Sequence, residues 1–273
     1  MAELAAWNGD QADGLRRLFG NRSPQVVAFA SGREACGRTT LVVQTAAALA
    51  AAGHGVVIID ENPAPDNALT AFGLASKHDF LHAVRGERSL AQVVLPAAPL
   101  VHIVPAARAA RELERLGDVA ERRLSARLRD VQQGASFVLI DCATRRSGHL
   151  SLLANSARHL AIVVTAQSAA ITNAYALIKR MAQDQGREHF HIVVTRARCG
   201  EEARAIYDNM RRVSREHLGV RVDYLGAAPV PVTDHLAHAL QHCLPPAVDG
   251  GEMDGFRPVR AAVQRPEALD SVL

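Results

Sequence analysis

Short apolar runs alternate with longer segments of helical periodicity along most of this 273-residue chain. The apolar runs are rich in Val and Ile and mostly continuous, which is typical of strands covered on both faces of a parallel sheet. We expect strands at residues 25–30, 56–60, 101–104, 137–141, 160–165, 189–195 and 222–227. Helical patterns lie between them, at residues 39–52, 108–133, 169–185 and 201–218.

The repeated strand–helix–strand order predicts an α/β fold with a doubly wound, mostly parallel sheet of about seven to eight strands and helices on both faces. We assign this domain to residues 23–248. Residues 1–22 form an N-terminal extension with one short helical pattern. Residues 249–273 contain several Gly and Pro residues, and we interpret them as a loose tail.

Composition narrows the class of protein. No apolar run approaches the roughly 18 residues of a membrane-spanning helix, and the N-terminus lacks the pattern of a secretion signal, so we expect a cytoplasmic protein. The four cysteines include no CxxC pair, which argues against a zinc ribbon or a disulfide framework. The net charge of +3 is too diffuse to indicate a nucleic-acid partner. Of 31 basic residues only Lys77 and Lys179 are lysines, so 31 − 2 = 29 are arginines.

A glycine-containing loop joins the first expected strand to a helix. It has Gly32, four residues, Gly37, Arg38 and Thr39, where the Walker A pattern is G-x-x-x-x-G-K-[ST]. Backbone N–H groups of such a loop, with the helix N-terminus, bind phosphate. The expected ligands are ATP or ADP with Mg²⁺, and the Thr39 hydroxyl stands where a magnesium ligand would sit. The phosphate-binding candidates are Gly32, Arg33, Gly37, Arg38, Thr39 and Thr40.

The loop resembles the deviant Walker A of the MinD/ParA family of ATPases, K-G-G-x-G-K-[ST]. In that alignment Arg33 stands at the lysine that reaches the partner's nucleotide across a dimer, and Arg38 stands at the ordinary Walker lysine. An Arg fork does not replace a Lys point charge conservatively. Glu34 would place a carboxylate beside a polyphosphate, and two like charges 5 Å apart cost about 3 kcal/mol at an effective dielectric near 20. We therefore expect ATP turnover to be lost or very slow.

Three further segments carry the resemblance. Asp60 and Asn67 match the family's D-x-D-x-x-x-x-N, but Asn62 replaces the second aspartate, and an amide cannot act as a base. Residues 137–141 end on Asp141, as a Walker B strand does. Thr195 replaces an asparagine that recognises the base. The resemblance implies catalytic roles for Asp60 and Asp141, magnesium ligation by Thr39 and Asp141, and nucleotide contact by Thr195.

Residues 10–16 read D-Q-A-D-G-L-R, which resembles the D-Q-A-x-x-L-R motif of the flagellar-number regulators, the FlhG/FleN group. Residues 171–179, I-T-N-A-Y-A-L-I-K, resemble the group's I-T-D-A-Y-A-L-I-K. The resemblance implies that the extension stimulates an FlhF-type GTPase through Asp10, Gln11, Ala12, Leu15 and Arg16. Other implied partners are a flagellar transcriptional activator, a switch-complex protein and a second copy in a nucleotide-dependent dimer. From the residues alone, this segment could also be an amphipathic helix docked on its own domain.

The group also ends in a basic amphipathic helix that binds the membrane. Here Pro258 and Pro266 interrupt the last residues, so we do not expect reversible membrane binding of that kind. The expected location is the cytoplasm, with a peripheral position at the cell pole implied by the resemblance.

Two other clusters have simpler interpretations. His235, His238 and His242, next to Cys243, permit metal binding on one helix face, but solvated histidines are the commoner outcome. A basic cluster on one expected helix comprises Arg204, Arg211, Arg212 and Arg215. Such a cluster could contact the DNA backbone, but a solvated helix face is the commoner outcome. The favoured function is a MinD/ParA-like regulator of flagellar number and placement that acts by protein contact. The alternatives are an ATP-hydrolysing dimeric switch and a partition-like DNA-binding protein.

Overall fold

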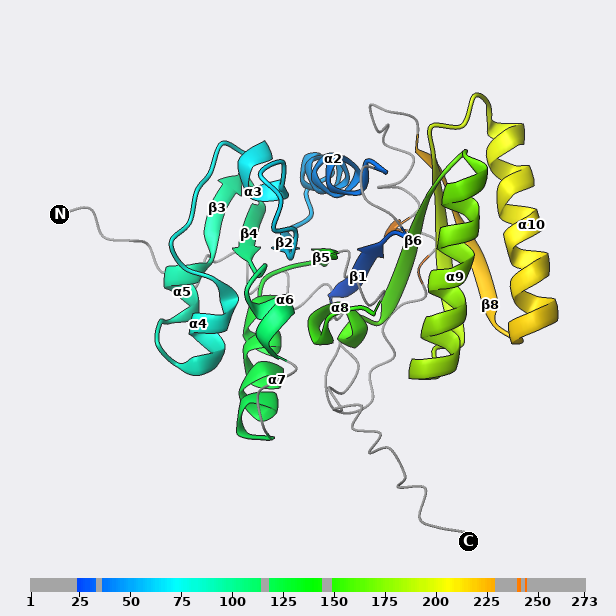
Figure 1. Ribbon diagram of the computed structural model, residues 1–273. Coiled ribbons are helices and arrows are strands. Elements are labelled where there is room, and N and C mark those ends of the chain that lie inside the picture. The colour runs from blue at the N-terminus through cyan, green and yellow to red at the C-terminus, as the bar shows by residue number, and fades with distance from the viewer. Residues whose placement is uncertain are drawn as a thin grey trace, which may run out of the picture.

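The computed structural model describes residues 24–32, 36–113, 118–143, 149–228, 240–241 and 244. Within them an eight-stranded sheet has the order β3-β4-β2-β5-β1-β6-β7-β8 (Figure 1). The strands are β1 (Gln25–Ala30), β2 (Val56–Asp60), β3 (Leu95–Ala98), β4 (Val101–Pro105), β5 (Phe137–Asp141), β6 (His159–Thr165), β7 (His189–Thr195) and β8 (Arg221–Ala228). The expected extension at 1–22 and tail at 249–273 lie outside the described residues.

All neighbouring strands are parallel except β3, which pairs antiparallel with β4. The prediction of a doubly wound, mostly parallel sheet with helices on both faces is confirmed. β3 was not predicted from the sequence. This strand has four residues, includes Pro96 and alternates between partly buried and exposed positions, which is the pattern of a short edge strand.

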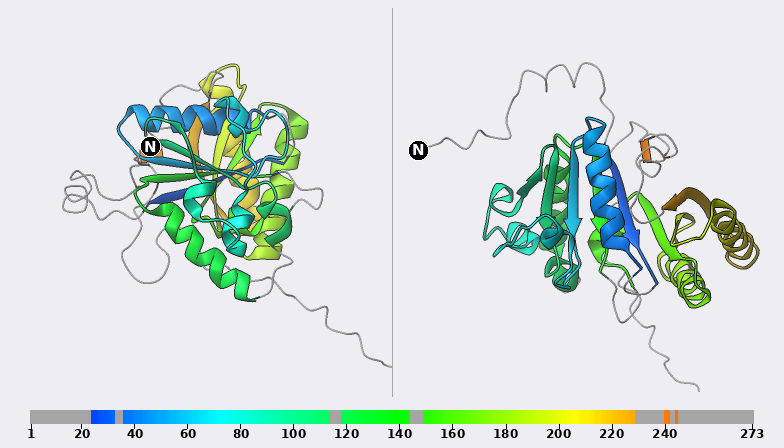
Figure 2. Two further views of the ribbon diagram at one scale, coloured as in Figure 1. Left: turned by 90° about the vertical axis from the view of Figure 1, so that its left-hand side faces the viewer. Right: turned by 90° about the horizontal axis from the view of Figure 1, so that it is seen from above.

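Helices cover both faces of the sheet (Figures 1 and 2). One face packs against α2 (Arg38–Ala51) and α3 (Ala68–Ala71). The other packs against the remaining helices, of which α9 and α10 cover β6 to β8. These helices are α4 (Phe80–Arg85), α5 (Leu90–Val93), α6 (Ala109–Glu112), α7 (Asp118–Gln132), α8 (Leu152–Ser156), α9 (Ser168–Gln185) and α10 (Gly200–Leu218).

Residues 108–133 hold two helices, α6 and α7, so the single long helix expected there is wrong. Residues 114–117 between them lie outside the described residues. They include Gly117, and a glycine in a helix interior costs about 1 kcal/mol relative to alanine. In the part of the chain that the structure describes, no helix is long and apolar enough to cross a membrane.

Alternate residues of the central strands face opposite layers. Val26 and Ala28 of β1 belong to the core under α4 to α10, whereas Val27 and Phe29 belong to the core under α2. All four are fully buried, which explains the continuous apolar runs. The polar residues of these strands are therefore concentrated at the two edges, where the strands begin and end. Asp60 and Asp141 are register partners at the carboxyl ends of β2 and β5.

Candidate functional site

The loop between β1 and α2 lies at the carboxyl edge of the sheet, close to α9. A Cβ on Gly32 would stand 2.4 Å from the backbone carbonyl of Asn173, so only glycine fits between the loop and this helix. Gly37, immediately before α2, has a φ of 80°, in the left-handed region that favours glycine. Arg33, Glu34 and Ala35 lie outside the described residues. The structure therefore requires glycine at these two positions for different reasons: close contact with α9 at Gly32, and a left-handed backbone at Gly37.

Arg38 is directed into the protein. Its Nε donates to Oδ1 of Asp141 at 2.5 Å, and its Nη1 donates to Oγ of Ser31 at 3.2 Å. Arg38 is 8% exposed and Asp141 is fully buried. Burial opposes the charge of Arg38, but the Asp141 carboxylate outweighs it and raises the pKa of the guanidinium. The residue expected at the Walker lysine position is therefore bound to the carboxylate expected at the end of the Walker B strand.

Thr39 and Asn62 complete this network. The Thr39 hydroxyl donates to Oδ2 of Asp141 at 2.6 Å and accepts a hydrogen bond from Nδ2 of Asn62 at 3.2 Å. Each oxygen of Asp141 thus accepts a hydrogen bond from a different side chain. Asn62 stands where the family has an aspartate, and here its amide contributes a donor that a carboxylate could not.

The backbone of the site has the form of an anion-binding loop, and its side chains are bonded to one another. The α2 N-terminus follows a left-handed glycine, as in phosphate-binding loops. However, the two candidate magnesium ligands, Thr39 and Asp141, are bonded to each other, and Arg38 is paired with Asp141. A magnesium ion held by Thr39 and Asp141 would therefore compete with Arg38 for the Asp141 carboxylate.

Asp60 organises the segment after β2. Its Oδ1 accepts from the backbone N–H of Asn62 at 3.0 Å, and its Oδ2 accepts from that of Leu69 at 2.9 Å. Burial, followed by the charge of Asp141, raises the pKa of Asp60 to about 7, although the two backbone N–H groups oppose the shift. Both carboxylate oxygens of Asp60 thus accept backbone hydrogen bonds from the segment after β2. A catalytic role for Asp60 remains a prediction.

Glu61 was not singled out from the sequence. It is fully buried, accepts from the backbone N–H of Ala143 at 3.1 Å and accepts a short hydrogen bond from the Ser151 hydroxyl. Ser151 also caps α8 through the N–H of Ala154. Glu61 therefore joins the end of β2 to both sides of the segment that follows β5. Little in the sequence indicated this role, because an acidic residue directly after the end of a strand is common in surface loops.

Thr195, at the end of β7, is 1% exposed. Its hydroxyl lies 3.3 Å from the carbonyl oxygen of Cys36 and 3.5 Å from that of Val164. The side chain thus connects β7 to the glycine-containing loop. Thr40 is exposed on the first turn of α2. Nucleotide contact by either residue remains a prediction.

Residues 24–192 match the family model described as an AAA domain. The chain belongs to this family. It is 27% identical over 214 residues to the antiactivator FleN of Pseudomonas aeruginosa, covering 78% of this chain and 76% of that one. It is 22% identical over 214 residues to the flagellum site-determining protein YlxH of Helicobacter pylori, covering 78% of this chain and 72% of that one.

Among solved structures, the septum site-determining protein MinD of Pyrococcus horikoshii, complexed with Mg-ADP, has the same fold. The two structures superpose with a TM-score of 0.55 at 17% sequence identity, and the match covers 80% of this chain and 93% of that one. The predicted resemblance to MinD/ParA-type P-loop ATPases and their FlhG/FleN group is thereby confirmed.

The remaining candidate residues fall into two sets. The partner-binding candidates (Asp10, Gln11, Ala12, Leu15 and Arg16) and the histidine candidates (His235, His238 and His242, with Cys243) lie outside the described residues. The basic cluster is an exposed face of α10, on which Arg204 pairs with Asp208 at 3.7 Å and Arg212 pairs with Glu216 at 3.2 Å. These ion pairs support a solvated face over a DNA-binding surface.

Proposed function

We propose that this protein is a MinD/ParA-like regulator of flagellar number and placement that acts by protein contact and does not turn over ATP. The contacts are made to an FlhF-type GTPase through Asp10, Gln11, Ala12, Leu15 and Arg16 of the extension. A flagellar transcriptional activator or a switch-complex protein is a further partner. The protein acts in the cytoplasm, peripherally at the cell pole.

Two independent observations support this proposal. The flagellar role rests on similarity to FleN, an antiactivator, and to YlxH, a flagellum site-determining protein. The loss of turnover rests on the buried pair between Arg38 and Asp141. A P-loop ATPase uses the cation at the position of Arg38 to bind phosphate and the carboxylate at the position of Asp141 to bind magnesium. In this protein the two side chains instead form an ion pair with each other, and this observation is the main support for the proposal.

A genetic experiment tests the flagellar role. The gene is deleted in its native host, and flagella per cell are counted by electron microscopy after complementation with the wild type or with a Gln11→Ala, Arg16→Ala double variant. We expect deletion to change the number of flagella, the wild type to restore it, and the double variant to fail at equal protein level. An unchanged number after deletion would contradict the flagellar role, and full rescue by the double variant would contradict contact through the extension.

A biochemical experiment tests the partner. Purified full-length protein is added to an FlhF-type GTPase, and GTP hydrolysis is followed by phosphate release. We expect the wild type to accelerate hydrolysis and the Gln11→Ala, Arg16→Ala variant not to do so. Acceleration that is equal for both proteins would place the contact elsewhere on the surface.

The second candidate is an ATP-hydrolysing dimeric switch with the same fold. It is favoured by the Mg-ADP complex of a MinD with this fold, and by the left-handed Gly37 at the start of α2. In that case Arg38 would leave Asp141 and contact phosphate when nucleotide binds. Phosphate release that is abolished by Asp141→Asn would support this switch over the proposed function.

A further inference from the structure

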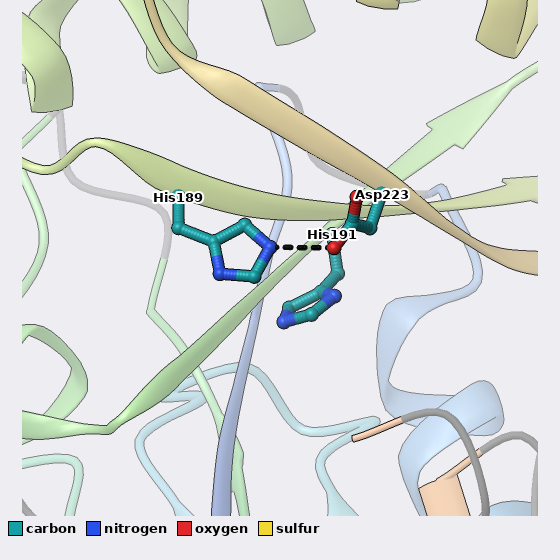
Figure 3. Close-up of side chains that lie close together, drawn as sticks. All are labelled: His189, His191 and Asp223. Atoms are coloured by element: carbon teal, nitrogen blue, oxygen red, sulfur yellow. Dashed lines mark hydrogen bonds and ion pairs between the residues drawn. The ribbon is translucent and has the colours of Figure 1, made fainter. Parts of the chain in front are cut away.

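A second polar cluster lies at the opposite edge of the sheet, where the strands begin. It contains His189 and His191 of β7 and Asp223 of β8, and one ligand atom from each lies within 4.8 Å of the other two. His191 and Asp223 are register partners in the parallel pair. Nε2 of His189 lies 2.8 Å from Oδ2 of Asp223. Figure 3 shows the three side chains gathered at adjacent strands.

Two neighbouring parallel strands bring these groups to one face. His189 and His191 are two residues apart, so both side chains lie on the same side of β7. Further along the same strands, Val193 and Leu225 belong to the core under α2, which places the cluster on that face of the sheet. Such a spacing of two residues is a usable sequence signal, whereas only the histidines near residue 240 were considered as metal ligands from the sequence.

A chain of hydrogen bonds determines which nitrogen of His191 carries a proton. The carbonyl oxygen of the Gln25 side chain lies 3.1 Å from Nε2 of His159, so that nitrogen must donate. In a neutral ring, Nδ1 of His159 then accepts from Nε2 of His191, at 3.3 Å. His191 consequently has its proton on Nε2 and a bare lone pair on Nδ1.

Both rings are held in the neutral form by their surroundings. Burial, assisted by the charge of Arg158, lowers the pKa of His159 to about 4, and burial, assisted by His189, lowers that of His191 to about 3. Among the described residues, Nδ1 of His191 has no hydrogen-bond partner, although the residue is only 2% exposed. A buried lone pair with nothing to accept is costly unless a ligand uses it.

We propose that His189, His191 and Asp223 bind one divalent transition-metal ion of the zinc class, with His159 as a positioning residue. Two imidazoles and one carboxylate form a ligand set that zinc uses when a fourth position stays open to water or another ligand. His159 fixes the ring and tautomer of His191, as a second hydrogen bond commonly does for a metal-binding histidine. This site is independent of the proposed function, because it lies at the other end of the strands.

The surroundings allow a metal ion to enter. The side chains of His189 and Asp223 are each 35% exposed, so the site opens to solvent on one side. Arg221 currently pairs with Asp223 at 2.8 Å, but its side chain is 72% exposed and can turn into water. Binding would displace this weak surface pair and link the outermost strand, β8, to β7.

The test uses the full chain after removal of metal with EDTA. Zinc is titrated into the protein by calorimetry, with magnesium as a comparison. We expect about one zinc per chain at a site that magnesium does not fill, and a higher melting temperature with zinc. His189→Gln and Asp223→Asn change partly exposed residues, and each should abolish this binding. His159→Gln should weaken it about 10- to 100-fold, as for other residues that support a ligand.

Three controls make each outcome decisive. Denaturation midpoints in EDTA establish that the variants are folded, and any misfolded variant is replaced by Asp223→Ser. The variant with His235, His238 and His242 all changed to Gln should keep the zinc site. X-ray absorption should show nitrogen and oxygen neighbours with imidazole scattering. Absence of binding, binding that survives His189→Gln and Asp223→Asn, or sulfur neighbours would each overturn the proposal.

Discussion

At the scale of single residues, the pairing of Arg38 with Asp141 dominates the candidate site. Both groups lose their water, and each is compensated by the other; Arg38 also donates a hydrogen bond to Ser31, and Asp141 accepts one from Thr39. A buried pair of this kind adds little net stability relative to apolar residues, yet removing one partner strands a buried charge. The pair therefore makes this site sensitive to either substitution.

Arg38→Ala should lower the free energy of unfolding by about 3–5 kcal/mol, because Asp141 would keep its charge in a buried site without its cation. Urea denaturation at pH 7 measures the change. The matched control is Arg85→Ala, since Arg85 pairs with Glu112 at 3.0 Å with both side chains 42% exposed. That exposed pair should cost about 0–1 kcal/mol. Equal losses in the two variants would contradict a buried, structural pair at Arg38.

The buried histidines His159 and His191 predict an acid-sensitive fold. Their folded pKa values, about 4 and about 3, lie below the ordinary value of 6.5. As the pH falls below 6.5, the unfolded chain binds protons that the folded chain does not, so stability is lost in that range. Each histidine contributes about 2 kcal/mol of loss between pH 6.5 and 5.

Asp60 has the opposite effect on stability as the pH falls. Its pKa is raised to about 7, so below that pH the folded chain binds a proton that the unfolded chain does not. The comparison must therefore be made between variants. In EDTA, His191→Gln should lose about 2 kcal/mol less stability than the wild type when the pH falls from 7.5 to 5. His217→Gln, at an exposed position on α10, should behave as the wild type. Identical losses in the wild type and His191→Gln would refute the neutral buried histidine.

At the scale of elements, the sequence predicted the strands well because burial on both faces leaves continuous apolar runs. It did less well with short elements. β3 and the one- or two-turn helices α3, α4, α5 and α8 carry too few residues for a period to show. Their positions depend on contacts between distant segments. Asp79 is an example, because its carboxylate joins the start of α4 to the start of α6.

Asp79→Ala should destabilise the protein by at least about 2 kcal/mol. Asp79 is 6% exposed and accepts backbone N–H groups from Leu81, Arg108 and Ala109 at 2.9–3.0 Å, so all three would lose their partner. The control is Asn67→Ala, which removes one capping bond from the N–H of Thr70 and a longer bond, 3.4 Å, to the Asn62 carbonyl, and should cost about 1 kcal/mol. Thermal or urea unfolding gives both values. A smaller loss for Asp79→Ala than for Asn67→Ala would contradict the shared cap.

At the scale of the whole molecule, the sheet has polar chemistry at both ends of its strands. The carboxyl edge holds the loop, Thr39 and Asp141, and motif spacing was enough to assign these to one site. The direction of Arg38 could not be predicted, because it depends on a residue 103 positions away along the chain. Asp223 and His159 at the amino edge were missed for the same reason, since they come from separate strands that only the fold brings beside the two histidines of β7.

Under the proposed function, Arg38 and Asp141 satisfy each other and leave the loop without magnesium–nucleotide chemistry. The most direct measurement is calorimetric titration of the purified full chain with ATP and ADP in the presence of magnesium, followed by an assay of phosphate release. We expect no binding at millimolar nucleotide and no phosphate release. Binding of ATP with phosphate release that Asp141→Asn abolishes would contradict the proposed function, and would identify the protein as a working switch.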